Sequence, residues 1–162
     1  MDLEDKIKNL KALLEEKILK LQWDFVEMKS NYEKELSEKL WFTDEQSRYW
    51  DADYKWIKIE YKKWKSIWLD LVRYSEILLK INKEASHETF TLFFIPDKEK
   101  KYIKEIIWIN TIKLIKKLNL IENIAISLIE LNNKLPRSFN AQASLTLKDI
   151  RSIADFILTN IK

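Results

Sequence analysis

The chain of 162 residues contains no glycine, and this absence constrains its fold more than any other feature. Glycine permits positive φ angles and close approach of the backbone to a phosphate. The P-loop, the dinucleotide-binding fingerprint and the nucleophile elbow all require it, so none is present in standard form. Tight hairpin turns of the primed types also favour glycine. We therefore expect helices joined by open loops.

The clearest periodicity lies between Trp41 and Lys83, a stretch that holds five of the seven tryptophans. Apolar residues recur there every seven positions, and a second series is offset by four. The two series are Trp50, Ile57, Trp64, Leu71, Leu78 and Tyr54, Tyr61, Trp68, Ser75. A 4-3 spacing is typical of one continuous helical seam. Thr43 and Gln46 fit a capping box before it. We predict one helix over residues 44–84.

Three further segments carry helical patterns. Residues 2–40 repeat their apolar positions every eleven residues, which predicts a long, nearly straight helix. Residues 98–134 predict a third long helix, for which we favour a straight course over a break at Asn119. Residues 147–161 predict a short amphipathic helix capped by Thr146. Each assignment rests on spacing alone.

Two segments interrupt these patterns, near 86–97 and 135–146. Residues 89–95 are rich in β-branched and aromatic side chains, and residues 139–145 alternate apolar and polar side chains. Both patterns indicate short extended or irregular segments. The two could pair only if the chain folds back at Asn119.

These patterns predict one all-α domain over residues 1–162. We expect an elongated antiparallel bundle of three long helices, coiled-coil-like in its packing, plus a short C-terminal helix. The expected helices cover about 2–40, 44–84, 98–134 and 147–161.

Composition narrows the setting. There is no cysteine, so disulfides and thiolate ligands are excluded. No apolar run reaches the roughly 20 residues that a membrane helix needs, and the acidic N-terminus does not resemble a secretory signal. We expect a cytoplasmic protein with no membrane contact. The net charge of +3 does not by itself imply a nucleic-acid partner.

The sequence offers little for catalysis or metal binding. Glu84 and the single histidine, His87, form one E-x-x-H pair, whereas a di-metal bundle needs two. Pro96, Asp97, Glu99 and Lys101 resemble the PD…ExK signature of nucleases, but their spacing is too short and no sheet is predicted to present them. We therefore expect no enzyme, no catalytic residue, no metal or other cofactor, and no small-molecule substrate.

Two groups of lysines are candidates for an anionic partner. In the predicted second helix a basic stripe runs beside two tyrosines that could stack on bases. A second cluster lies where the third helix should begin, and cations there oppose the helix dipole. The residues are Lys55, Lys58, Lys62, Lys65, Tyr54 and Tyr61 in the stripe, and Lys98, Lys100, Lys101 and Lys104 in the cluster. Nucleic-acid binding through these residues is our alternative function.

Aromatic residues at the start of the second helix are candidate anchors for a protein partner, although core packing is the more common role of such residues. They are Trp41, Phe42, Trp50 and Trp56. Our leading hypothesis is a non-enzymatic helical interaction protein: a subunit, adaptor or inhibitor-like binder that docks on a larger assembly or self-associates.

Overall fold

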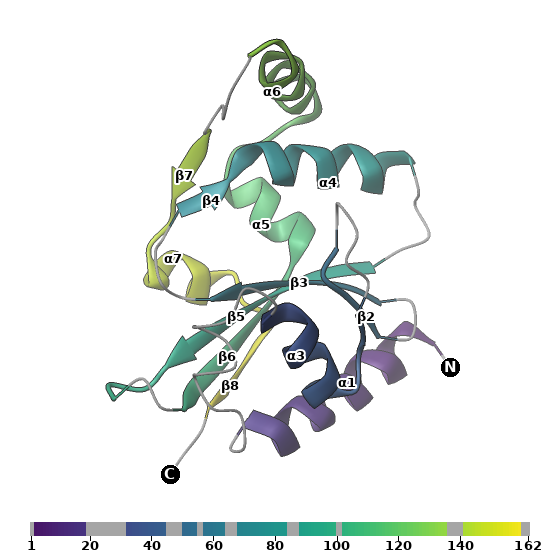
Figure 1. The fold of residues 1–162 in the computed structure, drawn as a ribbon, viewed down its shortest axis with the longest axis vertical. Coiled ribbons are helices and arrows are strands. Elements are labelled where there is room, and N and C mark those ends of the chain that lie inside the picture. Colours follow the sequence, from purple (N-terminus) through teal and green to yellow (C-terminus); the bar gives the residue numbers. More distant parts are fainter. Residues whose placement is uncertain are drawn as a thin grey trace.

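A computed structural model describes residues 2–18, 32–44, 50–54, 57–63, 68–83, 88–99, 102–135 and 141–159. The fold is mixed α/β: a six-stranded mixed sheet and a two-stranded sheet, with helices on both faces of the large sheet (Figure 1). The predicted all-α, coiled-coil-like bundle is therefore wrong.

The large sheet has the strand order β1-β2-β3-β5-β6-β8. All neighbours are antiparallel except β3 and β5, which run parallel. The strands are β1 (Thr43–Asp44), β2 (Ala52–Tyr54), β3 (Ile57–Lys63), β5 (Glu88–Pro96), β6 (Ile103–Asn110) and β8 (Phe156–Thr159).

A parallel pair needs a crossover connection. Here the crossover contains β4 (Trp68–Asp70) and α4 (Leu71–Lys83). The short β4 pairs with β7 (Gln142–Ser144) to form the second sheet. Asp70 starts α4 because its Oδ1 accepts hydrogen bonds from the backbone N–H groups of Val72, at 3.0 Å, and Arg73, at 3.3 Å. The first turn of α4 is thereby fixed over the sheet.

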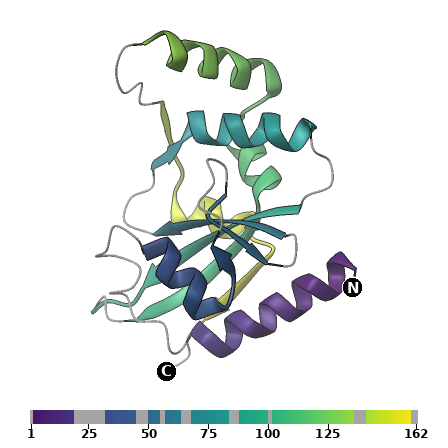
Figure 2. The ribbon, with the colours of Figure 1, turned by 45° about the vertical axis from the view of Figure 1, so that its right-hand side comes forward.

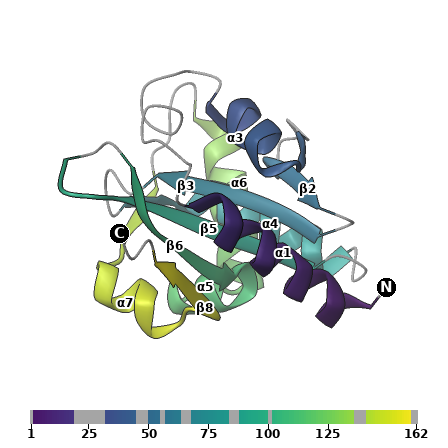
Figure 3. The same cartoon turned by 90° about the horizontal axis from the view of Figure 1, so that it is seen from below.

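The helices lie in layers on the two sheet faces (Figures 2 and 3). On one face lie α1 (Leu3–Ile18) and α3 (Tyr32–Leu40); on the other lie α4, α5 (Thr111–Lys117) and α7 (Leu147–Ser152). α6 (Glu122–Lys134) packs on the outer side of α4. We call the two sides of the sheet the α1 face and the α4 face.

Each face has its own core, and β3 and β5 alternate between them. Ile57, Ile59 and Tyr61 belong to the core of the α1 face, together with Phe90, Leu92, Phe94 and Trp108. Phe93, Ile95, Ile107 and Ile109 point to the other side, where they pack with residues of α4, α5 and α7. The period-2 alternation of a strand therefore decides which residues of β3 reach the α4 face.

Within the described residues, the predicted helix over 44–84 is present only in its last part, Leu71–Lys83. Thr43 does not cap a helix, because it lies in β1; Gln46 lies outside the described residues. The error has a physical cause. Ile57 and Tyr61 satisfy helical i,i+4 spacing, but with Ile59 they also satisfy strand alternation, and burial between two helical layers selects the strand.

Among the described residues, the other three predicted helices are present only in part. Residues 3–18 and 32–40 are helical, as two separate helices on the α1 face. Residues 98–134 are not one straight helix: they contain β6, α5 and α6, and the chain turns at Asn119, whose φ is 58°. In place of the helix over 147–161 there are α7 and β8.

Two local predictions are confirmed. Thr146 caps α7 in a full capping box with Asp149. The segment 89–95 is extended, as part of β5. The fold-back at Asn119, the alternative to the straight helix that we favoured, occurs, but the second extended segment pairs with β4 instead of 89–95. Within the described residues, no helix is long and apolar enough to span a membrane.

Candidate functional site

Two carboxylates lie near each other at the β2–β3 hairpin. The register pairs Ala52 with Ile59, so Asp51, the residue before β2, lies beside the part of β3 that carries Glu60. The Asp51 backbone N–H donates to the Ile59 carbonyl at 2.9 Å, and the Tyr61 N–H donates to Asp51 Oδ2 at 2.8 Å. The Asp51 charge acts unfavourably on Glu60, so this arrangement needs a positive partner.

Strand alternation delivers Glu60 and Lys62 to the same face. Their neighbours Ile59 and Tyr61 point into the α1-face core, so Glu60 and Lys62 point towards α4. The Lys62 Nζ lies 3.5 Å from Glu60 Oε1. Glu60 and Lys62, separated by one residue on β3, therefore form an acid–base pair beside Asp51.

Arg73, in the first turn of α4, connects the two acids. Its Nε donates to Glu60 Oε1 at 2.8 Å, and its Nη2 lies 3.4 Å from Asp51 Oδ1. The Arg73 side chain keeps 27% of its surface exposed, against 2% for Glu60 and 8% for Asp51. The acids are thus buried beneath a cation that reaches solvent. We call Asp51, Glu60, Lys62 and Arg73 the acidic cluster.

The environment of Glu60 disfavours the charged form of its carboxyl. Burial raises the pKa of its carboxyl, and the charge of Asp51 adds to the rise, while Lys62 and Arg73 oppose it. Its second oxygen, Oε2, is buried without a hydrogen-bond partner among the described residues. A buried carboxylate oxygen without a partner is costly, and such groups concentrate at functional sites.

Tyr74 closes the inner side of the cluster. Its ring is fully buried, and the Lys62 Nζ lies 5.7 Å from the ring centroid. Burial, followed by the Glu60 charge, raises the pKa of the Tyr74 hydroxyl well above its usual range. Tyr74 therefore stays neutral and places its ring beside Lys62.

The cluster suits a hard divalent cation. Mg²⁺ prefers oxygen ligands and commonly binds through one or two carboxylates, with water and substrate phosphate completing its shell. Glu60 Oε2 is an oxygen ligand without a partner, and Arg73 connects its carboxylate to Asp51. No group of three or more Asp, Glu, His or Cys side chains that could hold a metal is found among the described residues. A cation bound by Asp51 and Glu60 would therefore need water and substrate phosphate to complete its coordination shell.

The described lysines of the predicted basic stripe, Lys58 and Lys62, lie on a strand and not on a helix. Lys58 and Lys62 share the α4 face, but Lys58 is paired with Asp53 at 3.0 Å. The tyrosines lie on the opposite face: Tyr61 is buried with its hydroxyl 2.9 Å from Ser37 Oγ, and Tyr54 packs against Phe42. Lys55 and Lys65 lie outside the described residues.

The second predicted cluster is a hairpin and not a helix N-terminus. β5 and β6 are joined here, with the Asp97 N–H bonded to the Tyr102 carbonyl at 3.0 Å. Lys98 and Lys104 are exposed, while Lys100 and Lys101 lie outside the described part of the chain. The dipole argument for an anionic partner at this place is therefore wrong.

The candidate aromatic anchors separate clearly. Phe42 and Trp50 are buried in the two cores. Trp41 is 73% exposed, and the Lys17 Nζ lies 4.3 Å from its ring. Trp56 is among the residues that the structure does not describe. Of the described anchors only Trp41 is available to a partner.

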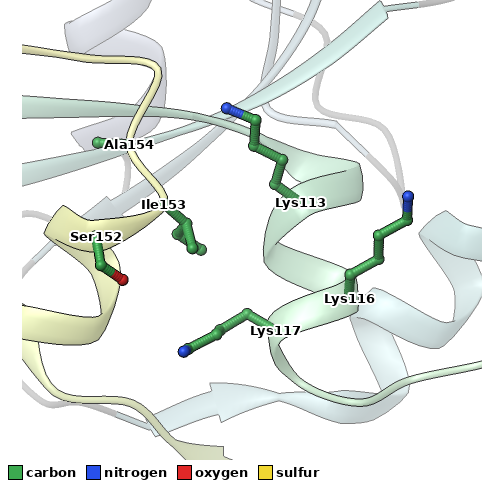
Figure 4. Close-up of a pocket in the computed structure, with 6 residues that line it drawn as sticks. All are labelled: Lys113, Lys116, Lys117, Ser152, Ile153 and Ala154. Atoms are coloured by element: carbon green, nitrogen blue, oxygen red, sulfur yellow. The ribbon is translucent and has the colours of Figure 1, made fainter.

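A pocket of about 470 Å³ lies between α5 and the end of α7 (Figure 4). It is lined by Lys113, Lys116, Lys117, Ser152, Ile153 and Ala154. Lys113 forms an ion pair with Asp155. Lys116 and Lys117 occupy the last turn of α5, where the helix dipole favours cations. The pocket adds positive charge to the α4 side of the sheet.

Sequence reasoning missed the acidic cluster. The order Asp51, Glu60, Lys62 was visible, as was the alternation Ile57-Lys58-Ile59-Glu60-Tyr61-Lys62. Interpreting this stretch as a helix put Glu60 and Lys62 on different sides of a cylinder. Recognition of the strand would have placed Glu60 and Lys62 on the same face of the sheet.

No family model, no curated protein and no solved structure matches the chain.

Proposed function

We propose that the protein is a metal-dependent nuclease whose site is Asp51, Glu60 and Lys62. The observation that carries the proposal is Glu60 Oε2, a buried oxygen without a partner among the described residues. Its carboxylate is connected to Asp51 by Arg73 and stands two residues before Lys62. The order D…E-x-K resembles the nuclease signature PD…ExK, and here a sheet presents it. Trp50 replaces the proline of that signature.

Each residue has a chemical role in this proposal. Asp51 and Glu60 would hold the cation, with the Tyr61 N–H fixing the Asp51 carboxylate. A bound divalent cation polarises a phosphoryl oxygen and lowers the pKa of its water. The Lys62 ammonium lies beside the acids and is placed to contact the negative charge that develops on phosphate.

The charge around the site favours a polyanionic substrate over a small phosphate ester. α5 and α7 lie on the same sheet face as the acidic cluster (Figure 1) and bring the lysines of the pocket there. Extended phosphate backbones are bound through several such lysines. Nucleic acid inside the cell would be the substrate, so a cytoplasmic location belongs to this proposal.

The test is cleavage of linear double-stranded DNA, single-stranded DNA and RNA by the purified protein. We expect cleavage of at least one of them with Mg²⁺ or Mn²⁺ and none in EDTA. A second measurement does not depend on activity: Mn²⁺ should raise the melting temperature of the wild type and leave that of Asp51→Asn unchanged. Intact substrates together with no metal-induced shift would refute the proposal.

The lysines of α5 should bind phosphates. Replacing Lys116 and Lys117 by glutamine should weaken DNA binding in EDTA and reduce the slope of log K against log salt by about two, at about 0.9 per lost phosphate contact. Lys8→Gln with Lys34→Gln is the matched control, since both lysines are exposed on the α1 face. Equal losses in the two double variants would show that only net charge matters.

The non-enzymatic interaction function expected from the sequence stays a prediction. The observation that favours it is the apolar exposure of α6 and its ends. Ile121, Ile124, Leu131 and Leu135 are 41–59% exposed, and with Leu128 they follow the 3-4-3-4 spacing of a helical seam. Light scattering at micromolar concentration checks self-association, and a monomer would count against that form of the hypothesis.

A further inference from the structure

The acidic cluster is already neutral without a metal ion. Asp51 and Glu60 contribute two negative charges, and Lys62 and Arg73 two positive ones. Each cation lies within 3.5 Å of a carboxylate oxygen. Buried charges need such compensation, because desolvation is costly. A divalent cation added to this arrangement would leave two positive charges in excess.

Arg73 contacts the oxygens that a cation would need. Its Nε is 2.8 Å from Glu60 Oε1 and its Nη2 is 3.4 Å from Asp51 Oδ1. Cation and guanidinium therefore compete for the same carboxylates, because two positive groups at such distances repel strongly where water is excluded. Glu60 Oε2, by contrast, is buried without a hydrogen-bond partner among the described atoms.

The head group of Arg73 can leave without disturbing the fold. Its backbone is held by Asp70 at the start of α4, whereas its side chain is 27% exposed. The long side chain can therefore turn outwards while the helix stays in place. The Glu60 side chain, at 2% exposure, is fixed by comparison.

We propose that Arg73 is the displaceable counter-ion of the metal site: a divalent cation expels its guanidinium from Asp51 and Glu60, and the freed guanidinium then binds a phosphate oxygen of the substrate. Guanidinium groups bind phosphate through paired hydrogen bonds, which a single ammonium cannot reproduce. Arg73 thus couples metal binding to substrate binding. This inference rests on the proposed nuclease function.

The experiment is a Mn²⁺ titration, followed by the paramagnetic resonance signal of free Mn²⁺, with wild type, Arg73→Gln and Arg73→Lys in the absence of nucleic acid. Arg73→Gln should bind Mn²⁺ about tenfold more tightly or better, because a competing charge is removed. Arg73→Lys should bind it as the wild type does, since the positive charge is kept. Both variants should cleave DNA more slowly than the wild type.

Folding is monitored in the same series. Arg73→Gln leaves Lys62 as the one cation of the cluster beside two buried carboxylates, so its melting temperature should be low in EDTA and rise more with Mn²⁺ than that of the wild type. Unchanged or weaker Mn²⁺ binding by Arg73→Gln, with a wild type that binds Mn²⁺ and cleaves DNA, would overturn this inference and leave the nuclease function intact. No Mn²⁺ binding by either protein would overturn both.

Discussion

Replacement of Glu60 by glutamine is expected to reduce metal-dependent cleavage by more than about a hundredfold, since loss of outer partners of a metal ligand alone costs 10–100-fold. The amide keeps the shape of the side chain and can still accept from the Arg73 Nε, but it no longer offers a charged oxygen to a cation. Glu105→Gln is the matched control. Glu105 is a second buried glutamate of the same sheet, paired with Arg151, and its replacement should leave cleavage unchanged.

The same variant should make the metal-free fold more stable at neutral pH. Burial raises the folded-state pKa of Glu60, whereas the unfolded chain ionises near its ordinary value of 4.5. The folded protein therefore holds this proton more tightly, and its contribution to stability is lost as pH rises from 4.5 through the raised pKa. Glu60→Gln does not lose this stability, because the amide does not ionise.

Urea unfolding in EDTA between pH 4 and pH 8 measures the difference. The free energy of unfolding of Glu60→Gln minus that of the wild type should grow with pH and then level off. A difference that shrinks as pH rises would contradict the assignment of Glu60 as a buried, destabilising carboxylate. Together, the two results would show a site that keeps stability low for the sake of function.

Replacement of Trp108 by alanine should destabilise the fold by about 3–5 kcal/mol, the usual cost of deleting a large buried aromatic side chain. Trp108 is fully buried on β6, with its ring centroid 4.7 Å from that of Phe90 and 4.8 Å from that of Phe156. The three rings tie β5, β6 and β8 together. Urea unfolding followed by circular dichroism measures the loss.

Two controls separate cavity formation from other effects. Trp108→Phe should cost less, because it keeps most of the ring and removes Nε1, which is buried without a hydrogen-bond partner among the described residues. Trp41→Ala should cost less than about 1 kcal/mol, because Trp41 is 73% exposed and is described with only a cation–π contact to Lys17. Equal losses for Trp41→Ala and Trp108→Ala would contradict the placement of these two side chains.

The sequence by itself determined the features that depend on neighbouring residues. Thr146 and Asp149 lie three positions apart, and a capping box needs nothing further. The β-branched and aromatic run 89–95 is extended both in the predicted bundle and in the observed fold. Acidic residues stand in the first turn of the helix Leu3–Ile18. In each case a local preference and the global fold agree.

Only the tertiary structure decided between helix and strand for residues 57–63, and with it the functional site. Ile57, Ile59 and Tyr61 suit both interpretations until β5 lies alongside in parallel and helices cover both faces. That packing turns Glu60 and Lys62 to one side, brings Asp51 across the hairpin and sets Arg73 above them. The contacts join residues ten to twenty-two positions apart, and no local pattern encodes them, because their energy comes from burial and charge in the assembled sheet.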